Sequence, residues 1–237
     1  LAQNKEGALI QNEIIGGLRL SGKITEDWRL GALYIQTAAD ADNEIAAFNN
    51  LMTTVQRKVG KRSNVNFFLV NRQATARERY RSTDQEHNRV IGADYNLASA
   101  DNVFRGRLHV HKSLQPGDHK GNFSTQAVFF YNPREWLVIT DISLVDKDFR
   151  ADLGFVPRTD VIRLGQAVQR IFYPQKSIFN THRLMLLLLN DHKPSESFRK
   201  TDHTYSLRYE AQFRNLANAS IYLSKIYTYL NFSFDPS

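Results

Sequence analysis

In residues 104–113 (FRGRLHVHKS), ionisable side chains occupy every second position from Arg105 to His111. Arg105, Arg107, His109 and His111 are each separated by a single residue. A β-strand turns alternate side chains to opposite faces, so these four share one face. Guanidinium groups bind carboxylates and phosphates, and imidazoles bind protons or metal ions. The row therefore predicts a surface for anions, or a pair of metal ligands at the two histidines.

Two imidazoles two residues apart on a strand can share one metal ion. A protein site for such an ion normally needs three or four ligands. The residues around His109 and His111 supply no third ligand by sequence. The sequence therefore predicts neither a metal site nor a cofactor.

Basic residues occupy the same kind of row in other strands of the chain. The full row is predicted as Arg19, Lys23, Arg105, Arg107, His109, His111, Arg208 and Arg214. Acidic residues predicted on the same rows are Asp94, Asp141 and Glu210. One hypothesis is a basic lumen that contacts anionic solutes, because charged rings set the selectivity of a pore. The other is a salt-bridged filling that closes a narrow lumen, and both remain open.

The opposite face of the same strands is apolar. In residues 104–113 it carries Phe104, Leu108 and Val110, and residues 204–214 (TYSLRYEAQFR) alternate in the same way. A soluble barrel or sandwich would bury such a face, whereas a transmembrane barrel would turn it to lipid. Alternation alone does not separate these architectures.

The order of strands and connections indicates an all-β, up-and-down antiparallel meander of about twelve strands. Strands are predicted at 14–24, 28–37, 49–59, 63–71, 89–98, 102–113, 121–132, 135–145, 160–173, 178–190, 202–215 and 219–232. Short turns alternate with long polar loops near 38–48, 72–88, 114–120, 146–159 and 191–201. Short turns at one end and long loops at the other are typical of outer-membrane barrels.

Composition limits the other classes of protein. The chain has 237 residues, a formal net charge of +7 and no cysteine. The longest apolar run, 184–189, is far shorter than the roughly 20 residues of a membrane-spanning helix, but a membrane strand needs only about 9–11 residues. No nucleophile elbow, phosphate-binding glycine loop or nucleic-acid-binding signature is present.

The polarity of the meander predicts that strands are missing at both ends. The first and last strands both adjoin a short turn, so both chain ends fall on the side of the long loops. In bacterial outer-membrane barrels those loops are extracellular and strand numbers are even. We therefore expect residues 1–237 to be a single-domain internal fragment of a barrel of about 14 strands or more.

Several stretches resemble one family: GGLRLSGKI, DWRLGALYIQT, VGKRSNVNFFLVNRQ, NRVIGADYNL and FRADLGFVPR. They are similar to the uncharacterised C-terminal domain of Bacteroidota outer-membrane proteins that carry an N-terminal family-nine-like carbohydrate-binding module. The resemblance covers about residues 14–170, and LGFVPR is its most specific part. It implies an outer-membrane β-barrel linked to glycan handling, without catalytic residues to carry over. The signal peptide and the carbohydrate-binding module are absent from the sequence given.

The predicted loop 146–159 contains several apolar residues between its charged ones. The residues singled out are Phe149, Gly154, Phe155, Pro157 and Arg158. Such a loop is expected to fold back into the barrel mouth and pack there. It would act either as a gate that contacts ligand or as a plug that only stabilises.

These observations favour a non-enzymatic barrel domain of the bacterial outer membrane, in transport or as the membrane anchor of a surface glycan-handling protein. The expected partners are outer-membrane lipid, a glycan or anionic solute, and other membrane proteins, but no nucleic acid. A barrel-borne hydrolase and a soluble ligand-binding β-barrel or sandwich are the two alternatives.

Overall fold

The computed structural model is all-β, and it describes residues 2–3, 9–10, 12–43, 45–75, 86–117 and 120–229. Twelve strands form one sheet: β3 (Ile14–Lys23), β4 (Trp28–Thr37), β5 (Phe48–Val59), β6 (Ser63–Ala74), β7 (His87–Ala98), β8 (Phe104–Leu114), β9 (Phe123–Tyr131), β10 (Trp136–Val145), β11 (Val161–Phe172), β12 (Phe179–Lys193), β13 (Arg199–Phe213) and β14 (Asn218–Tyr227). A separate two-stranded sheet pairs β1 (Ala2–Gln3) with β2 (Leu9–Ile10).

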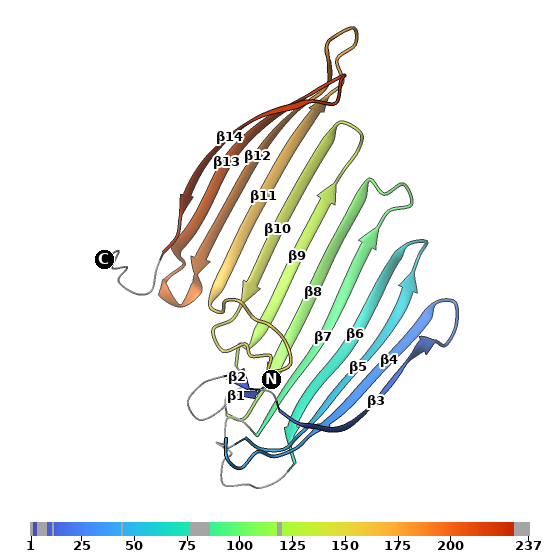
Figure 1. Ribbon diagram of the computed structural model, residues 1–237, viewed down its shortest axis with the longest axis vertical. Helices are drawn as coiled ribbons and strands as arrows, with labels where there is room; N and C mark the ends of the chain where they lie inside the picture. The colour runs from blue at the N-terminus through green and yellow to red at the C-terminus, as the bar shows by residue number, and fades with distance from the viewer. Residues whose placement is uncertain are drawn as a thin grey trace. The chain divides into compact units, whose positions relative to one another are not determined.

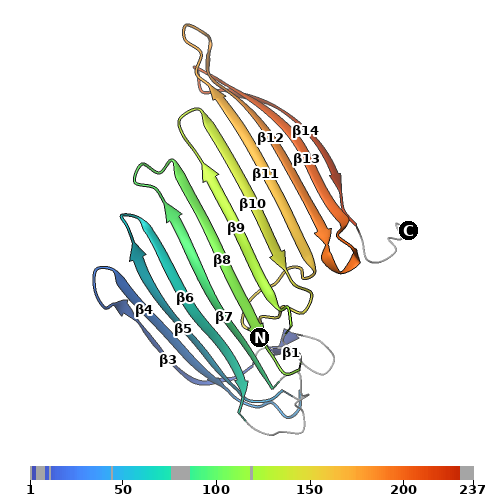
Figure 2. The same cartoon turned by 180° about the vertical axis from the view of Figure 1, so that it is seen from behind.

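The twelve strands lie in chain order across the sheet, from β3 at one edge to β14 at the other (Figures 1 and 2). The predicted up-and-down antiparallel meander is confirmed. The order is linear, and no pairing joins β3 to β14 among the described residues, so the sheet is not closed. Every residue of β3 and of β14 is exposed.

The strands form where apolar and polar residues alternate, and they end at residues suited to tight turns. Backbone φ is positive at Gly60, Asn102, Lys176 and Leu216, each in a short connection. Glycine and asparagine adopt this left-handed conformation at little cost, which favours hairpins at the first two positions. The short connections therefore fall where the sequence predicts them.

Most strands differ from their predicted limits by one to three residues, and the differences are larger around the last two hairpins. β12 and β13 extend through most of the predicted loop 191–201, which shrinks to a 3₁₀ turn at Pro194–Glu196 and its flanks. The predicted last strand, 219–232, ends at Tyr227 as described, and its residues 230–232 lie outside the described part of the chain. No helix among the described residues is long and apolar enough to cross a membrane.

The chain divides into two compact units. The first unit comprises Leu1–Tyr95, His109–Ser124 and Asp146–Thr159, and the second comprises Asn96–Leu108, Thr125–Val145 and Asp160–Ser237. The first unit has a small apolar core of Ile45, Ala46, Phe48 and Ala74. Buried apolar side chains in the second unit include Val161, Ala167 and Ala211, so neither unit has a large apolar interior among the described residues.

Candidate functional site

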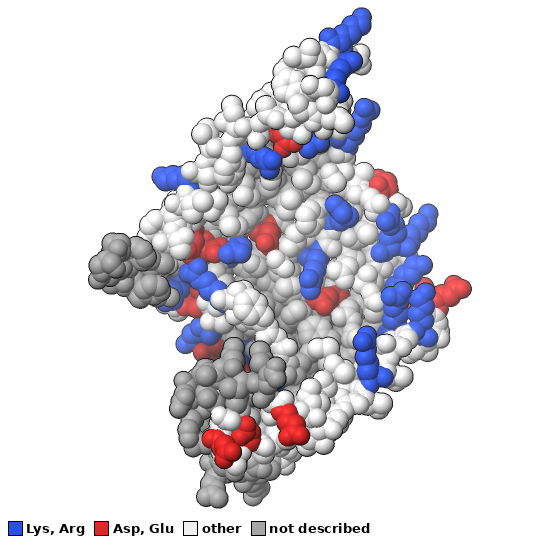
Figure 3. Space-filling model, in the orientation of Figure 1, with Lys and Arg blue, Asp and Glu red and all other residues white. Residues whose placement is uncertain are grey.

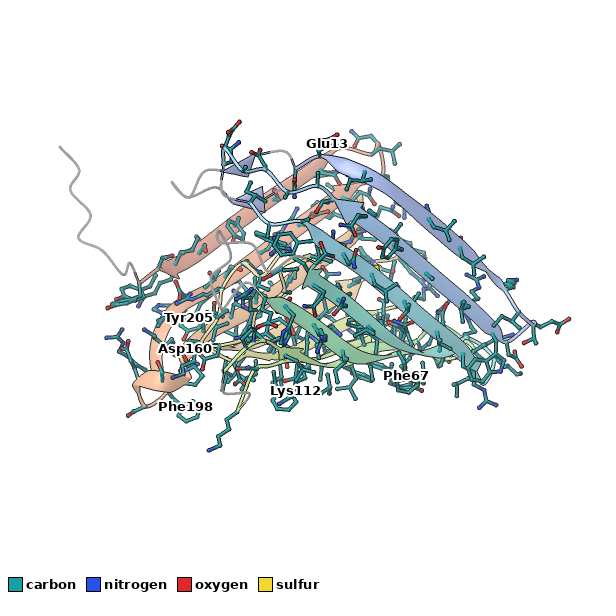
Figure 4. The ribbon with its side chains drawn as sticks, turned by 90° about the horizontal axis from the view of Figure 1, so that it is seen from below. Glu13, Phe67, Lys112, Asp160, Phe198 and Tyr205 are labelled. Carbon is teal, nitrogen blue, oxygen red and sulfur yellow. The ribbon has the colours of Figure 1, made fainter. Side chains whose placement is uncertain are left out.

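The strands of the first unit carry two unlike faces. We call one of them the polar face. It holds side chains from β5, β6, β7 and β8 that form a chain of contacts, in the order Thr54, Asn66, Asp94, His111 and His109. The apolar face is the other side. It includes Phe67 at 58% and Ile91 at 43% exposed, and Figure 4 shows Phe67 and Lys112 projecting from that side.

The second unit has the same division. On its polar face Arg163 of β11 donates two hydrogen bonds to Asp191 of β12, at 2.8 and 2.7 Å. Glu210 of β13 accepts from Arg208 at 2.9 Å and from Arg183 of β12 at 3.3 Å. The apolar face of this unit holds the exposed residues Ile142, Leu164, Leu184, Leu186, Leu188, Leu207, Tyr209, Ile221 and Leu223. Ion pairs therefore connect the polar face from strand to strand.

The eight residues of the predicted basic row are distributed over β3, β8 and the second half of β13 with its end, in both units. Arg19 and Lys23 lie on β3, where the register places them beside Leu33 and Arg29 of β4. In the second unit Arg105 stacks over the ring of Phe130 at 5.7 Å, and Arg107 lies on the same strand, β8. Arg214 follows the last residue of β13, and its backbone N–H donates to Ile178. His109 and His111, in contrast, are brought together with a carboxylate.

The histidine–aspartate cluster consists of His109 and His111 of β8 and Asp94 of β7. The two imidazole rings are stacked, with centroids 4.3 Å apart and planes inclined by 14°. The Nε2 atom of His111 lies 3.0 Å from Oδ1 of Asp94. One nitrogen from each histidine and one carboxylate oxygen all lie within 4.8 Å of one another. Among the described residues, this cluster brings three potential metal ligands within reach of one ion.

Neighbouring side chains hold the cluster in place. Asn66 donates to the second oxygen of Asp94 at 3.3 Å and accepts a hydrogen bond from Thr54. The edge of Phe68 meets the ring of His111, with centroids 4.8 Å apart and planes at 79°. Sequence reasoning missed Asn66 and Phe68, because only the register between strands brings them to the cluster.

Gly92 of β7 leaves the room that these rings occupy. A Cβ atom at this position would lie 2.5 Å from Cδ2 of His111 and 2.5 Å from Cζ of Phe68. We expect Gly92→Ala to displace both rings and to lower the free energy of unfolding by about 1–3 kcal/mol, the usual cost of overpacking. Urea titration with an unchanged slope would measure the loss.

The control for that substitution is Gly22→Ala on β3, where an added Cβ meets nothing within 4 Å. Its free energy of unfolding should stay within about 0.5 kcal/mol of the wild type. Equal effects of the two substitutions would show that the rings do not depend on Gly92.

The loop 146–159 is anchored to the polar face of the first unit at its N-terminal half. Asn88 of β7 donates to the carbonyl of Arg150 at 3.0 Å and accepts from the N–H of Asp152 at 3.0 Å. The N–H of Arg150 donates to Ser113 at 3.2 Å, and both Asn88 and Ser113 are buried. Sequence reasoning missed these two anchors, since isolated Asn and Ser residues carry no signal of their own.

The five residues predicted for this loop behave differently from one another. Phe149 is buried at 7% exposed, whereas Phe155 is 89% exposed. The N–H of Gly154 donates to Ala151 in a tight turn, and Pro157 and Arg158 follow it towards β11. The first part of the loop therefore packs, and its tip around Phe155 does not.

A pocket of about 290 Å³ lies beside this anchored loop. It is lined by Ile14, Leu33, Ile35, Phe48, Asn50, Met52, Arg72, Asp152 and Leu153, among others. Arg72 lies over the ring of Phe48 at 3.6 Å and donates to Asp152 at 2.9 Å. The lining is apolar with one ion pair at its side, which suits a ligand that has both apolar and polar parts.

The carboxylate of Asp152 is sensitive to its two arginine neighbours. Burial alone would raise its pKa, but hydrogen bonds and charges from Arg150 and Arg72 outweigh burial, so the pKa is lowered from the ordinary 3.8. A carboxyl group whose pKa is lowered on folding stabilises the fold above its unfolded pKa. This stabilisation is lost as pH falls below 3.8 and through the lowered value.

We therefore expect acid to release the loop. A probe on a cysteine introduced at Leu153, which lines the pocket beside Asp152 in a chain that has no other cysteine, should become more mobile as pH falls below 3.8. Asp152→Asn should make the probe mobile at neutral pH as well. Asp148→Asn is the control, because the carboxylate of Asp148 is exposed and its ion pair with Lys147, at 3.9 Å, lies on the surface. An immobile probe in Asp152→Asn at all pH values would contradict this role.

A second, basic cavity of about 450 Å³ lies in the first unit beside the turns that join β3 to β4 and β5 to β6. Its lining includes Lys23, Arg29, Lys58, Lys61 and Arg62, with Glu26 and Asp27 as acidic neighbours. Basic side chains gather near these turns in Figure 3. Of the predicted basic row, Lys23 is the residue that reaches this cavity, which suits an anionic solute.

Comparisons with known proteins add no identity to this geometry. No family model, curated protein or solved structure matches the chain. The resemblance to the Bacteroidota outer-membrane domain stays a prediction, and a function has to be inferred from the residues of the chain itself.

Proposed function

We propose that the twelve-stranded sheet belongs to a β-barrel of a bacterial outer membrane, and that it acts in transport or as a membrane anchor rather than as an enzyme. One observation carries the proposal: across β11, β12 and β13 the large apolar side chains of one face are exposed, and buried polar side chains lie on the other face. In the second unit Leu164, Leu186 and Leu207 are 41–45% exposed, while Asp191 and Ser206 are 2% and 7% exposed.

This distribution is the reverse of that expected in water. Soluble proteins rarely expose large contiguous apolar surfaces. Strands of outer-membrane barrels place apolar residues towards lipid and polar residues towards the interior. The ion pairs Arg163–Asp191 and Arg183–Glu210 fit such an interior, because each sheltered carboxylate has a guanidinium partner.

Aromatic residues next to the short turns support the same proposal. Trp28, Trp136 and Tyr173 lie at the turn ends of their strands or just beyond, and Arg57, Arg170 and Arg134 respectively stack on their rings. Rings with a polar neighbour at one level are favoured at a membrane interface. The basic side chains that line the cavity of the first unit would suit an anionic or glycan solute.

The experiment is the mobility of the full-length protein from isolated outer membranes, boiled and unboiled, in mild SDS. A membrane barrel stays folded in the unboiled sample and migrates faster. Swelling of liposomes that contain the protein, with neutral and anionic sugars, then separates transport from anchoring. Recovery in the soluble fraction with no heat-dependent shift would reject the proposal.

A further inference from the structure

We propose that Asp94, His109 and His111 bind one divalent transition-metal ion of the Zn²⁺ type. The two histidines occupy alternate positions of β8, and β7 supplies the carboxylate beside them. The sequence provides two of these ligands on one strand. The pairing of β7 with β8 adds the third, which lies 17 residues away along the chain.

The distances suit a site that closes on its ion. Zn²⁺ binds imidazole nitrogen and carboxylate oxygen at about 2.0–2.2 Å, so tetrahedral donors lie about 3.4 Å apart. The three donor atoms here lie within 4.8 Å of one another, and one pair is at 3.0 Å. Closing on an ion would require side-chain rotation that reorients the two stacked rings and brings donor atoms now up to 4.8 Å apart to about 3.4 Å.

Neighbouring side chains keep the three ligands next to one another. His111 is held between Phe68 at its edge and His109 on its face, and Gly92 permits that approach. Asp94 is oriented by Asn66, which leaves its other oxygen towards His111. Hydrogen bonds of this kind to a carboxylate ligand fix its direction and raise metal affinity.

The set of ligands selects the class of ion. Two imidazoles and one carboxylate are borderline donors that suit Zn²⁺, Co²⁺, Ni²⁺ and Fe²⁺, whereas Mg²⁺ and Ca²⁺ prefer oxygen alone. Three protein ligands leave at least one coordination position for water or an anion. His111 and Asp94 retain 17% and 12% side-chain exposure, so an outside molecule can reach that position. The site is therefore of the open kind rather than a closed structural centre.

The test is metal binding by the whole chain, purified without a histidine tag, stripped with chelator and held in detergent. Calorimetry with Zn²⁺ should give one ion per chain. Single variants His109→Asn, His111→Asn and Asp94→Asn should each bind at least about tenfold more weakly. Binding of Co²⁺ should produce the visible absorption bands of a four- or five-coordinate N/O site, which the same variants should lose.

Matched controls remove one histidine and one aspartate elsewhere. His182→Asn removes an imidazole that contacts Tyr209, and Asp141→Asn removes a carboxylate that accepts from Gln126; both should bind Zn²⁺ like the wild type. Circular dichroism and heat-dependent mobility identify any variant that fails to fold, and the double variant His109→Gln and His111→Gln then replaces it. Equal Zn²⁺ binding by the wild type and the double variant, or no binding by the wild type, would overturn the proposal. Preference for Mg²⁺ or Ca²⁺ would do the same.

Discussion

Leu186→Arg is expected to destabilise the protein in a bilayer by about 2–4 kcal/mol, the cost of a charge on the lipid face near the membrane midplane. Leu186 lies in the middle of β12 on the apolar face, where it is 45% exposed and pairs with Val168 and Leu207. In an isolated sheet in water, such an exposed position would accept arginine within about 0.5 kcal/mol. The large effect is therefore specific to the proposed environment.

The matched control is the next residue. Leu187 faces Ala167 and Ser206 on the polar face, where arginine joins a row of charged side chains. We expect Leu187→Arg to cost at most about 1 kcal/mol. Urea unfolding in lipid vesicles compares the two variants at the same depth in the same strand. A larger loss for Leu187→Arg than for Leu186→Arg would mean that the two faces have been assigned the wrong way round.

Arg163→Ala is expected to cost about 2–4 kcal/mol, because it removes both hydrogen bonds that this guanidinium donates to the sheltered carboxylate of Asp191. Asp191 has 3% side-chain exposure and accepts both hydrogen bonds of the pair from Arg163. The side chain of Arg163 is 45% exposed, so the expected loss is smaller than the roughly 3–5 kcal/mol of breaking a fully buried ion pair. The urea midpoint should fall with little change of slope.

Arg208→Ala is the control for this pair. Arg208 is 53% exposed, and its partner Glu210 keeps a second guanidinium, that of Arg183. Removal of an exposed pair of this kind costs about 0–1 kcal/mol. Similar losses of unfolding free energy for Arg163→Ala and Arg208→Ala would show that burial of the carboxylate does not determine how much its arginine stabilises the fold.

Much of the fold could be predicted from the sequence, because alternation and turn residues are local signals. The strand predicted at 28–37 has those limits in the structure, and the one predicted at 14–24 ends one residue earlier. The ends of β12 and β13 could not be predicted, because residues such as Asp191, His192 and Lys200 resemble a solvated loop. Pairing across the hairpin, with a register shift between Asp191 and His192, keeps them in strands.

The candidate site could be predicted only in part. The shared face of His109 and His111 follows from their spacing on one strand. Asp94 was identified as a residue of the polar rows, but its position against His111 depends on the register of β7 and β8, which no local pattern specifies. The anchoring of Arg150 and Asp152 by Asn88 likewise depends on how the loop folds back over the strands.

The most direct measurement determines whether each face of one strand contacts lipid or water. Leu207 and Arg208 are neighbours on β13, both are exposed, and they point to opposite faces. Because the chain has no cysteine, a spin label at Leu207→Cys or Arg208→Cys reports on one position alone. The full-length protein in lipid vesicles would be exposed to oxygen, which concentrates in the bilayer, and to a water-soluble nickel chelate.

The account predicts that the label at position 207 collides with oxygen and is shielded from the chelate, while the label at position 208 is shielded from bilayer oxygen. Access of the chelate to position 208 would further indicate a water-filled interior. A label at position 207 that meets the chelate, or one shielded from both reagents, would contradict the assignment of the apolar face to lipid.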